Sequence, residues 1–442
     1  MKERGIWLIL LLAFGCRLYH VDFPVSGWHA WRQADTAAVA RNYYENGFDF
    51  LHPQIDWGGN SPGVVEMELP LYPFLVALAY RVFQPADLWG RLLSLLFGLA
   101  TIFALYRLVE VRVGARIALW AALLYAILPL NIYYSRAFMP ESAMLLCTVL
   151  GVHLFWEWRQ RGRFAFGVLG AVFVSLAVLL KSTSLYLGIL LLALAWEGRG
   201  KRCLLEWRLW LLAALVLLPV WGWYAHAHRI YETSGLTFGI WDFGTGKWGD
   251  ARPLWTLKFY NDVFFKSIAE RHLTYGGFIP FVLGVVLARG KREMRPFGWW
   301  LLAVVVYILV VARGNQVHEY YQLPFIPPAV VFAALACKTT LPASSRVKAR
   351  RPLRALLLIG LLALPVLSFL RVANFMRKED RGSALFQLAA AVRQQTPDNA
   401  LIVAVDSNDP VLLYSCRRKG WHARPEALGA AALETRAVQG AR

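Results

Sequence analysis

Long runs of apolar residues, separated by short clusters of charged ones, fill the first 370 positions of the chain. Most of these uncharged runs hold 15–19 residues. Flanking Arg and Lys side chains can extend each run toward the roughly 20 residues that cross a hydrocarbon layer. The pattern predicts an all-α polytopic membrane protein with about eleven transmembrane helices. The stretches are 5–16, 92–106, 117–135, 142–156, 164–180, 182–196, 209–225, 273–288, 296–312, 320–337 and 355–370.

Two shorter apolar stretches need separate interpretations. The run 5–16 follows the basic sequence MKERG, which is also typical of a signal peptide. The sequence from Cys16 to His20 is a poor cleavage site for a signal peptidase, so we expect a retained anchor. The run 69–80 contains Pro70 and Pro73 and holds only 12 uncharged residues. We predict that it forms a short helix lying at the outer membrane interface.

The composition agrees with a membrane protein. Hydrophobic residues make up 58% of the chain and charged residues 17%, whereas soluble domains average about 45–50% and about 25%. A water-soluble protein and a disordered chain are therefore excluded. The net charge of +19 would suit a nucleic-acid-binding protein, but in a membrane protein the position of the charges must be considered first.

The charges are distributed very unevenly between the two sides. The segments 1–4, 107–116, 157–163, 197–208, 289–295 and 338–354 together hold 22 Lys/Arg and six acids. The loop 20–87, on the other side, holds three Lys/Arg and eight acids. The positive-inside rule places the first set, and hence the N-terminus, in the cytoplasm. The net charge thus encodes orientation, and no nucleic-acid partner is expected.

This topology leaves three large segments outside. Residues 1–370 form a transmembrane module with outer loops 20–87 and 226–272, and residues 371–442 form a small α/β segment, which looks incomplete. In that segment we expect a helix at 384–393, a strand at 401–405, and a second strand or a helix at 411–414. Of five scattered cysteines only Cys416 lies clearly outside, so we expect no disulfide and no cysteine-rich metal site.

The first outer loop contains a carboxylate with two interpretations. From Asp35 onward the sequence has helical spacing, so Asp35 could simply cap the helix N-terminus. Alternatively, a carboxylate partly shielded from water can act as a general base toward a hydroxyl group.

Other outer charges also have a structural and a functional interpretation. Glu68 and Glu141 precede or begin helices, where an acid compensates the helix dipole, but both could also carry chemistry. Lys181 could be an interfacial anchor or an anion ligand. Further candidates for binding a phosphate or sugar are Arg32, Arg136, Arg313, His318 and Tyr320. Together they predict a site for an anionic substrate dissolved in the membrane.

Four motifs together resemble a known family. These are His29-Ala-Trp-Arg-Gln-Ala-Asp35-Thr, Pro70-Leu-Tyr-Pro, Arg136-Ala-Phe-Met-Pro-Glu141 and His318-Glu-Tyr-Tyr-Gln-Leu-Pro324. In this order and sidedness they resemble bacterial glycosyltransferases of the GT-C superfold. Within that superfold they resemble more closely the family 39-like enzymes, which are related to protein mannosyltransferases and lipid A aminoarabinose transferases. The resemblance covers about residues 1–340.

The resemblance implies an activity and a location. Such enzymes sit in the bacterial cytoplasmic membrane and move a sugar from a polyprenyl-phosphate carrier to an acceptor hydroxyl on a lipid, glycan or protein, usually with inversion. Asp35 then matches the proposed base, and Glu141 the second acidic position. Arg136, Lys181, Arg313 and His318 become candidates for binding the carrier phosphate. The aminoarabinose group has a lysine before the paired prolines, whereas this chain has Glu68 there, so no phosphate contact is expected from that position.

Some alternatives stay open at the level of sequence. No metal site is assigned, although Asp35 and Glu141 could share a divalent ion. A transporter or flippase of a lipid-linked sugar is one rival, but it would be expected to carry ionisable residues in mid-span and inverted repeats, and neither is apparent. A non-catalytic membrane protein of glycan assembly is the other.

Overall fold

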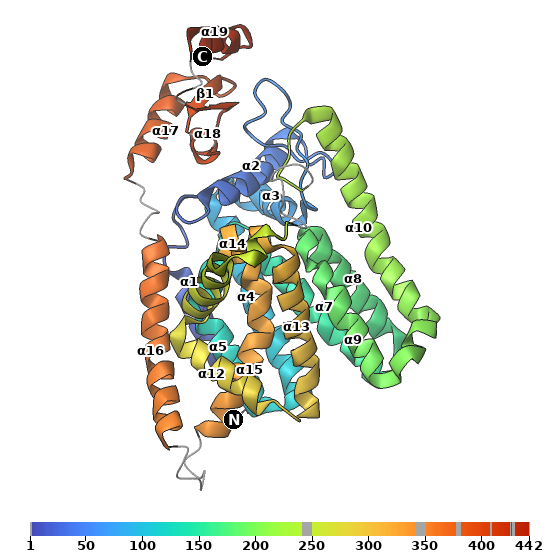
Figure 1. The fold of residues 1–442 in the computed structure, drawn as a ribbon. Coiled ribbons are helices and arrows are strands. Elements are labelled where there is room, and N and C mark those ends of the chain that lie inside the picture. The colour runs from blue at the N-terminus through green and yellow to red at the C-terminus, as the bar shows by residue number, and fades with distance from the viewer. Residues whose placement is uncertain are drawn as a thin grey trace.

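A bundle of helices makes up most of the protein (Figure 1). The computed structural model describes residues 2–240, 250–341, 351–376, 382–406, 409–424, 426 and 429–441. All eleven predicted stretches form helices within these residues. The helices of the first half are α1 (Lys2–Leu18), α2 (Ala30–Asn46), α3 (Leu71–Phe83), α4 (Asp87–Val113), α5 (Ala115–Ile127), α6 (Pro129–Tyr134), α7 (Glu141–Arg161), α8 (Phe164–Leu180), η1 (Ser182–Tyr186), α9 (Leu187–Arg199), η2 (Gly200–Leu205) and α10 (Trp207–Ser234).

The second half continues the bundle. Its elements are η3 (Arg252–Trp255), α11 (Leu257–Tyr260), η4 (Asn261–His272), α12 (Thr274–Leu287), η5 (Arg292–Met294), α13 (Arg295–Val310), α14 (Ala312–Val317), η6 (Glu319–Phe325), α15 (Ile326–Thr340) and α16 (Arg351–Met376). Of the predicted outer loop 226–272, residues 241–249 lie outside the described part of the chain.

Among the described residues, five helical segments are long and apolar enough to cross a membrane. They are α4, α10, α16 and the continuous segments Arg292–Val310 and Glu319–Thr340. Four shorter apolar helices accompany them: α3, α5, α8 and α12. The apolar stretch of the segment that contains α15 is 89% buried, whereas the apolar stretches of α10 and α16 are each only 22% buried. The bundle is therefore built around α15, and α10 and α16 present their apolar side chains to the surroundings.

Close backbone contact fixes the centre of the bundle. The packing of α12 against α15 requires a glycine, because a Cβ atom at Gly284 would lie only 1.8 Å from the carbonyl oxygen of Phe332. The helix pairs α7–α8, α4–α5 and α4–α7 pack side by side as well. Small residues at such crossings let two helices approach in the way that is common in membrane proteins.

Several predicted spans are broken near one end. The stretch 117–135 divides into α5 and α6 at Leu128–Pro129, and the helix α8 ends where Lys181 takes an extended conformation (φ −158°, ψ 111°) before η1. A further break follows Val311, after α13. Non-helical backbone within a membrane protein is tolerated where it is buried in protein. These breaks allow side chains to point into the bundle end instead of along a helix face.

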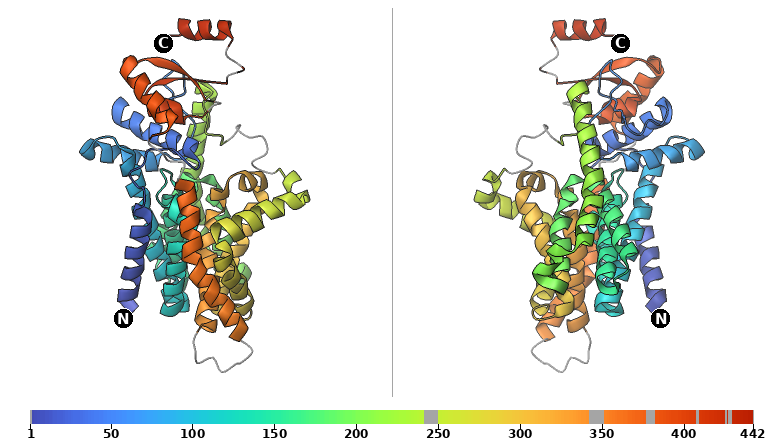
Figure 2. Two further views of the ribbon diagram at one scale, coloured as in Figure 1. Left: turned by 90° about the vertical axis from the view of Figure 1, so that its left-hand side faces the viewer. Right: turned by 90° about the vertical axis from the view of Figure 1, so that its right-hand side faces the viewer.

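The two ends of the bundle differ in what covers them. The N-terminus lies at one end, and α2, α3 and the C-terminal segment lie at the other (Figures 1 and 2). The predicted interfacial stretch 69–80 is the helix α3, which packs against α2. The assignment of the N-terminal end to the cytoplasm stays a prediction from the charge distribution.

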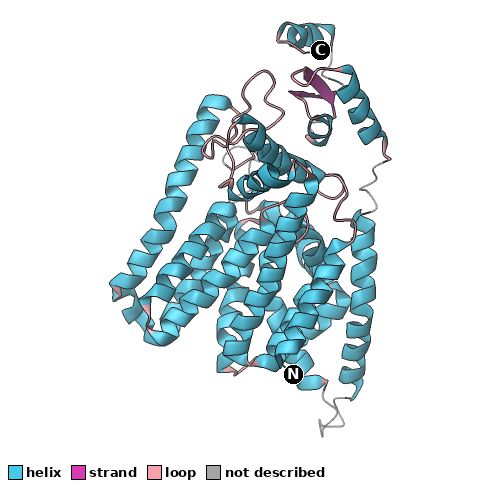
Figure 3. Ribbon diagram, turned by 180° about the vertical axis from the view of Figure 1, so that it is seen from behind, coloured by secondary structure: helices cyan, strands magenta, loops and turns pink. Residues whose placement is uncertain are grey.

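The C-terminal segment holds the two strands of the described chain, which Figure 3 shows apart from the helical bundle. Its elements are α17 (Ala384–Gln395), β1 (Leu401–Val405), α18 (Val411–Cys416), β2 (Lys419–Ala423) and α19 (Ala430–Val438). The helix at 384–393 and the strand at 401–405 are confirmed. The stretch 411–414 is a helix, and the second strand, parallel to β1 with Leu401 opposite Lys419, begins at Lys419. All five cysteines are free, and Cys416 is buried.

Candidate active site

The helix α2 places two candidate side chains at the covered end of the bundle. It runs without a break from Ala30 to Asn46, because no glycine or proline occurs between these residues, and it ends at Gly47. The residue before it, His29, has a left-handed conformation (φ 52°). Asp35 therefore lies inside the helix, and the interpretation of Asp35 as a capping residue is wrong. Its Oδ1 atom instead accepts a hydrogen bond of 2.9 Å from the indole Nε1 of Trp57.

The environment of Asp35 favours a carboxyl group that titrates near neutral pH. The residue is only 6% exposed. Burial raises the pKa of Asp35 to about 7, although the hydrogen bond from Trp57 and the charges of Arg32 and His422 act in the opposite direction. A carboxylate with such a pKa can accept a proton at physiological pH and release it again.

A second carboxylate is held by a cation from α2. Arg32 Nη2 donates to Glu68 Oε2 at 2.8 Å, and the Arg32 guanidinium lies 4.7 Å from the ring centroid of Phe238. Burial alone would raise the pKa of Glu68. The Arg32 and Lys181 charges and the hydrogen bond from Arg32 outweigh burial and hold that pKa below its usual value. Glu68 therefore stays ionised and fixes the guanidinium.

The third carboxylate belongs to a buried ion pair. Lys181, at the break after α8, donates to Glu141, the first residue of α7. Lys181 is 5% exposed and Glu141 is fully buried. The Lys181 ammonium also lies 4.5 Å and 4.9 Å from the ring centroids of Tyr320 and Tyr321. Cation–π contacts of this kind are strongest where water is excluded.

The two ion pairs and Asp35 form one group. Arg32 interacts electrostatically with Glu141 as well as with its partner Glu68. Glu68 in turn interacts with Lys181, and Asp35 with Arg32. We call these side chains the acid–base cluster; its members are Arg32, Asp35, Glu68, Glu141, Lys181 and Tyr320.

Two oxygen atoms next to this cluster have no hydrogen-bond partner among the described residues. They are Oε2 of Glu141 and Oδ1 of Asn131. Both residues line one small cavity, together with Tyr134, Ser135 and other neighbours. A small cavity inside the bundle thus lies behind the cluster, and it exposes mainly apolar surface.

Glu319 organises the aromatic side of the site, which the sequence did not reveal. Its carboxylate accepts hydrogen bonds from Trp28 and Tyr134 and pairs with His29 at 3.3 Å. The ring of His318 lies 5.5 Å from that of His29. The acid stands inside the motif that begins at His318, and that position is the signal that could have identified it.

The aromatic side is joined to the acid–base cluster through Tyr320. The ring of Tyr320 lies 5.3 Å from that of His318 in a stacked arrangement, and it also carries the Lys181 ammonium on its face. His318 and Tyr320 therefore belong to the same region as Lys181.

Two candidates lie elsewhere. Arg136 is fully buried and donates to the carbonyl oxygen of His20. The side chain of Arg313 is 51% exposed and pairs with Asp250 at 3.6 Å, and Asp250 also binds Arg252. Arg136 thus binds the backbone just after α1, and Arg313 belongs to a separate ion pair. No group of three or more His, Cys, Asp or Glu residues suited to a metal ion occurs in the described part of the chain.

Comparison with known proteins gives the fold. The family model described as dolichyl-phosphate-mannose-protein mannosyltransferase matches residues 65–224, which include Glu68, Glu141 and Lys181 but not Asp35. The structure of ArnT from Cupriavidus metallidurans in the apo state superposes with a TM-score of 0.70 at 16% identity, covering 98% of this chain and 88% of that one. The chain has the GT-C fold.

Further structures agree. ArnT bound to undecaprenyl phosphate gives a TM-score of 0.69 at 16% identity, covering 98% of this chain and 87% of that one. The oligosaccharyltransferase of Archaeoglobus fulgidus, in a complex with Zn and sulfate, gives a TM-score of 0.61 at 14% identity. The match covers 96% of this chain and 63% of that one. No curated protein matches the sequence significantly. The GT-C fold expected from the motifs is thereby confirmed, and with it a multi-pass membrane protein.

Proposed function

We propose that this protein is a membrane glycosyltransferase that moves a sugar from a polyprenyl-phosphate carrier to an acceptor hydroxyl, with Asp35 as the general base. The observation that carries the proposal is the position of a buried carboxyl group, with a pKa of about 7, close to Arg32, whose charge also interacts with the Glu141 of the second ion pair, at one end of a GT-C bundle. The match to ArnT bound to undecaprenyl phosphate supports the nature of the carrier.

The reaction needs little beyond these groups. Asp35 takes the proton of the acceptor hydroxyl while the hydroxyl oxygen attacks the anomeric carbon of the sugar. The bond from that carbon to the phosphate oxygen breaks, and the phosphate leaves with the electron pair, still attached to its polyprenyl chain. Attack opposite the leaving group inverts the anomeric centre. The charge that develops on the phosphate is where cations stabilise the transition state.

Arg32 and Lys181 are the cations that we assign to the phosphate. Each is held by a carboxylate, Glu68 or Glu141, so its position is fixed before the substrate arrives. A guanidinium has five N–H donors, and the hydrogen bond to Glu68 occupies one of them. The carboxylates thus act as positioning groups, and the cations need no large rearrangement during the reaction.

The acceptor approaches from the Asp35 side in this account. Asp35 lies on α2, which is covered by the C-terminal segment, whereas the acid of the second ion pair lies at the start of α7. We propose that the site faces the outer side of the bacterial cytoplasmic membrane, where the acceptor is a lipid, a glycan or a protein. This sidedness rests on the distribution of the Lys and Arg residues.

The variant Asp35→Asn tests the proposal, because it keeps the shape of the side chain and removes its basicity. Cells that lack the gene are complemented with the wild-type protein, with Asp35→Asn, or with Asp250→Asn as a matched control in an ion pair with Arg313. Mass spectrometry follows surface glycans and lipid-linked sugars at equal protein levels. We expect loss of one glycan sugar and accumulation of its lipid-linked donor with Asp35→Asn alone. Unchanged transfer by Asp35→Asn contradicts the proposal and favours a flippase or an assembly protein.

A further inference from the structure

The C-terminal segment touches the first loop directly on both sides of Trp57. The backbone N–H of Gly420, in β2, donates to the carbonyl of Asp56 at 3.0 Å. The N–H of Gly59 donates to the carbonyl of Gly420 at 2.8 Å. Two hydrogen bonds to one residue of β2 thus hold the loop before and after the indole.

The contact leaves no space for a larger residue in the loop. Gly59 has a positive φ of 66°, and a Cβ atom there would lie 2.3 Å from the indole nitrogen of Trp421. The conformation and the close approach both require glycine. The fit between the loop and β2 is therefore specific.

The indole of Trp57 joins the C-terminal segment to α2. It packs against the apolar cluster of the segment, whose buried members are Ala389, Ile402, Ala404, Leu413 and Cys416. At the same time its Nε1 atom donates to Asp35. One side chain thus connects the core of the segment with the carboxylate of the site.

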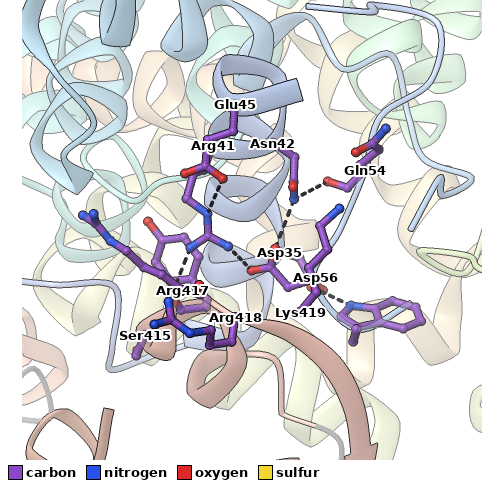
Figure 4. Close-up of polar contacts among 12 residues, drawn as sticks. Asp35, Arg41, Asn42, Glu45, Gln54, Asp56, Ser415, Arg417, Arg418 and Lys419 are labelled. Carbon is purple, nitrogen blue, oxygen red and sulfur yellow. Dashed lines mark hydrogen bonds and ion pairs between the residues drawn. The ribbon is translucent and has the colours of Figure 1, made fainter. Parts of the chain in front are cut away.

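Polar contacts next to Asp35 strengthen this junction, as Figure 4 shows. Arg41 on α2 pairs with Asp56 at 2.5 Å and also donates to the carbonyl of Tyr414, in α18, at 3.2 Å. Asn42 donates to the other oxygen of Asp56 at 3.1 Å. The loop, α2 and α18 are therefore linked on the same face of α2 that carries Asp35.

A histidine of the segment completes the surroundings of the indole. His422 Nδ1 lies 3.0 Å from Asp406 Oδ1, and the imidazole centroid lies 6.1 Å from that of the Trp57 ring. Asp406 is the residue that directly follows β1, and His422 belongs to β2. The pairing of the two strands therefore sets the orientation of His422. The imidazole Nε2 atom has no hydrogen-bond partner among the described residues.

We infer that the C-terminal segment is a working part of the Asp35 site, in which Trp57 and His422 are positioning residues that orient the Asp35 carboxylate. The hydrogen bond from Trp57 occupies Oδ1, and the other oxygen of the carboxylate is left to receive the proton of the acceptor hydroxyl. This inference rests on the proposed function of Asp35 as the base. It assigns a role in the reaction to residues 401–406 and 409–423, which lie outside the matched family region.

The charged groups that face Asp35 come from three elements. Arg32 belongs to α2, Asp56 to the first loop and His422 to β2. The Arg32 and His422 charges favour the ionised carboxylate, and Asp56 opposes it. Removal of the Trp57 hydrogen bond or of the His422 ring therefore shifts the titration of Asp35 toward higher pH.

The pH profile of sugar transfer tests the inference, because a merely structural segment would change the rate without moving the profile. Membranes with the full-length protein are assayed for transfer from the endogenous lipid-linked donor between pH 5.5 and 9. We expect Trp57→Phe to move the acidic limb upward by about one pH unit, since a hydrogen bond to a charged group is lost. His422→Gln should move it in the same direction by a smaller amount. Trp421→Phe, a matched change in β2 without contact to Asp35, should leave the limb in place.

The outcomes separate the two proposals. If Asp35→Asn retains transfer, the proposed function fails. If Asp35→Asn is inactive while Trp57→Phe and His422→Gln keep the wild-type limb, the positioning role is wrong and the base assignment stands. Size-exclusion profiles identify variants that do not fold, and should Trp57→Phe be one of them, His422→Gln and Trp421→Phe still decide the question.

Discussion

Arg32 on α2 and Glu68 before α3 form an ion pair of 2.8 Å, and both side chains are largely shielded from solvent. An ion pair in such a place loses much hydration, and by itself it is weak evidence for stability. The pair does fix a guanidinium beside Asp35, with most of its N–H donors left for another partner. We therefore interpret it as preparation for an anion.

Removal of this guanidinium should weaken binding of the carrier. We expect Arg32→Ala to lower the affinity for undecaprenyl phosphate at least tenfold, because a shielded charge–phosphate contact is lost. Arg32→Lys should lose part of this affinity, since an ammonium group cannot bind an anion through two parallel hydrogen bonds as a guanidinium can. Calorimetry on the detergent-solubilised protein measures the affinity. The exposed Arg313→Ala variant is the control; an equal loss there would show that the phosphate contact is elsewhere.

The buried pair of Lys181 and Glu141 should show strong coupling in thermal unfolding. Lys181→Met leaves an uncompensated buried carboxylate, a change that typically costs about 3–5 kcal/mol. The double variant Lys181→Met/Glu141→Gln should regain much of the lost melting temperature but no sugar transfer, because the cation for the phosphate is still missing. Additive effects of the two single changes on melting temperature would show that the pair does not act as a unit.

The rate of transfer should depend on the ionisation of Asp35. Because its pKa is raised to about 7, the base is increasingly protonated below that pH, and the rate falls as the pH is lowered through 7. A profile of the apparent second-order rate constant checks this. Binding of undecaprenyl phosphate, which does not need the base, should not follow the same curve.

The same carboxyl group should reduce stability at high pH. Its pKa rises from 3.8 to about 7 on folding, so the folded state binds a proton more tightly than the unfolded state. The contribution of this group to stability is full below pH 3.8 and is lost as the pH rises through 7. Asp35→Asn should therefore raise the melting temperature at pH 8, and the corresponding gain in the free energy of unfolding has an upper bound on the order of 4 kcal/mol. It should have little effect near pH 4.

A carboxylate whose pKa is lowered, Asp250, provides the control for this stability prediction. Arg252 holds the pKa of Asp250 at about 2, so that carboxylate gains nothing from neutralisation. Asp250→Asn should give no increase in melting temperature at pH 8. A gain of equal size in both variants would mean that the effect comes from net charge and not from burial.

The helices of the bundle could be predicted from sequence, but their breaks could not. Each apolar run coincides with helix in the described chain, as expected if the runs match the hydrocarbon layer. The run 117–135 gave no sign of its division into α5 and α6, apart from Pro129. The extended residue Lys181 pairs with Glu141, which is 40 positions away in the sequence. Sequence patterns describe single elements, and such contacts lie between elements.

The sequence predicts which side chains could form the candidate site, but it does not predict which of them pair with one another. Lys181 and Arg136 look alike in sequence, as single cations at the ends of spans. The structure pairs Lys181 with Glu141 and places Arg136 against the carbonyl of His20. Trp57 was missed because an aromatic residue in a loop has no periodic pattern, and its role depends on the docking of the C-terminal segment. The strand β2 was missed for the same reason: Lys419-Gly420-Trp421-His422-Ala423 becomes a strand by pairing with β1.

A structure of the protein with undecaprenyl phosphate, determined by electron cryomicroscopy in lipid nanodiscs, tests the central claim most directly. The account predicts that the phosphate lies within hydrogen-bond distance of Arg32 or Lys181, in a cavity that also opens onto the Asp35 carboxylate. A phosphate bound beside Arg313, or at the N-terminal end of the bundle without access to Asp35, would contradict it.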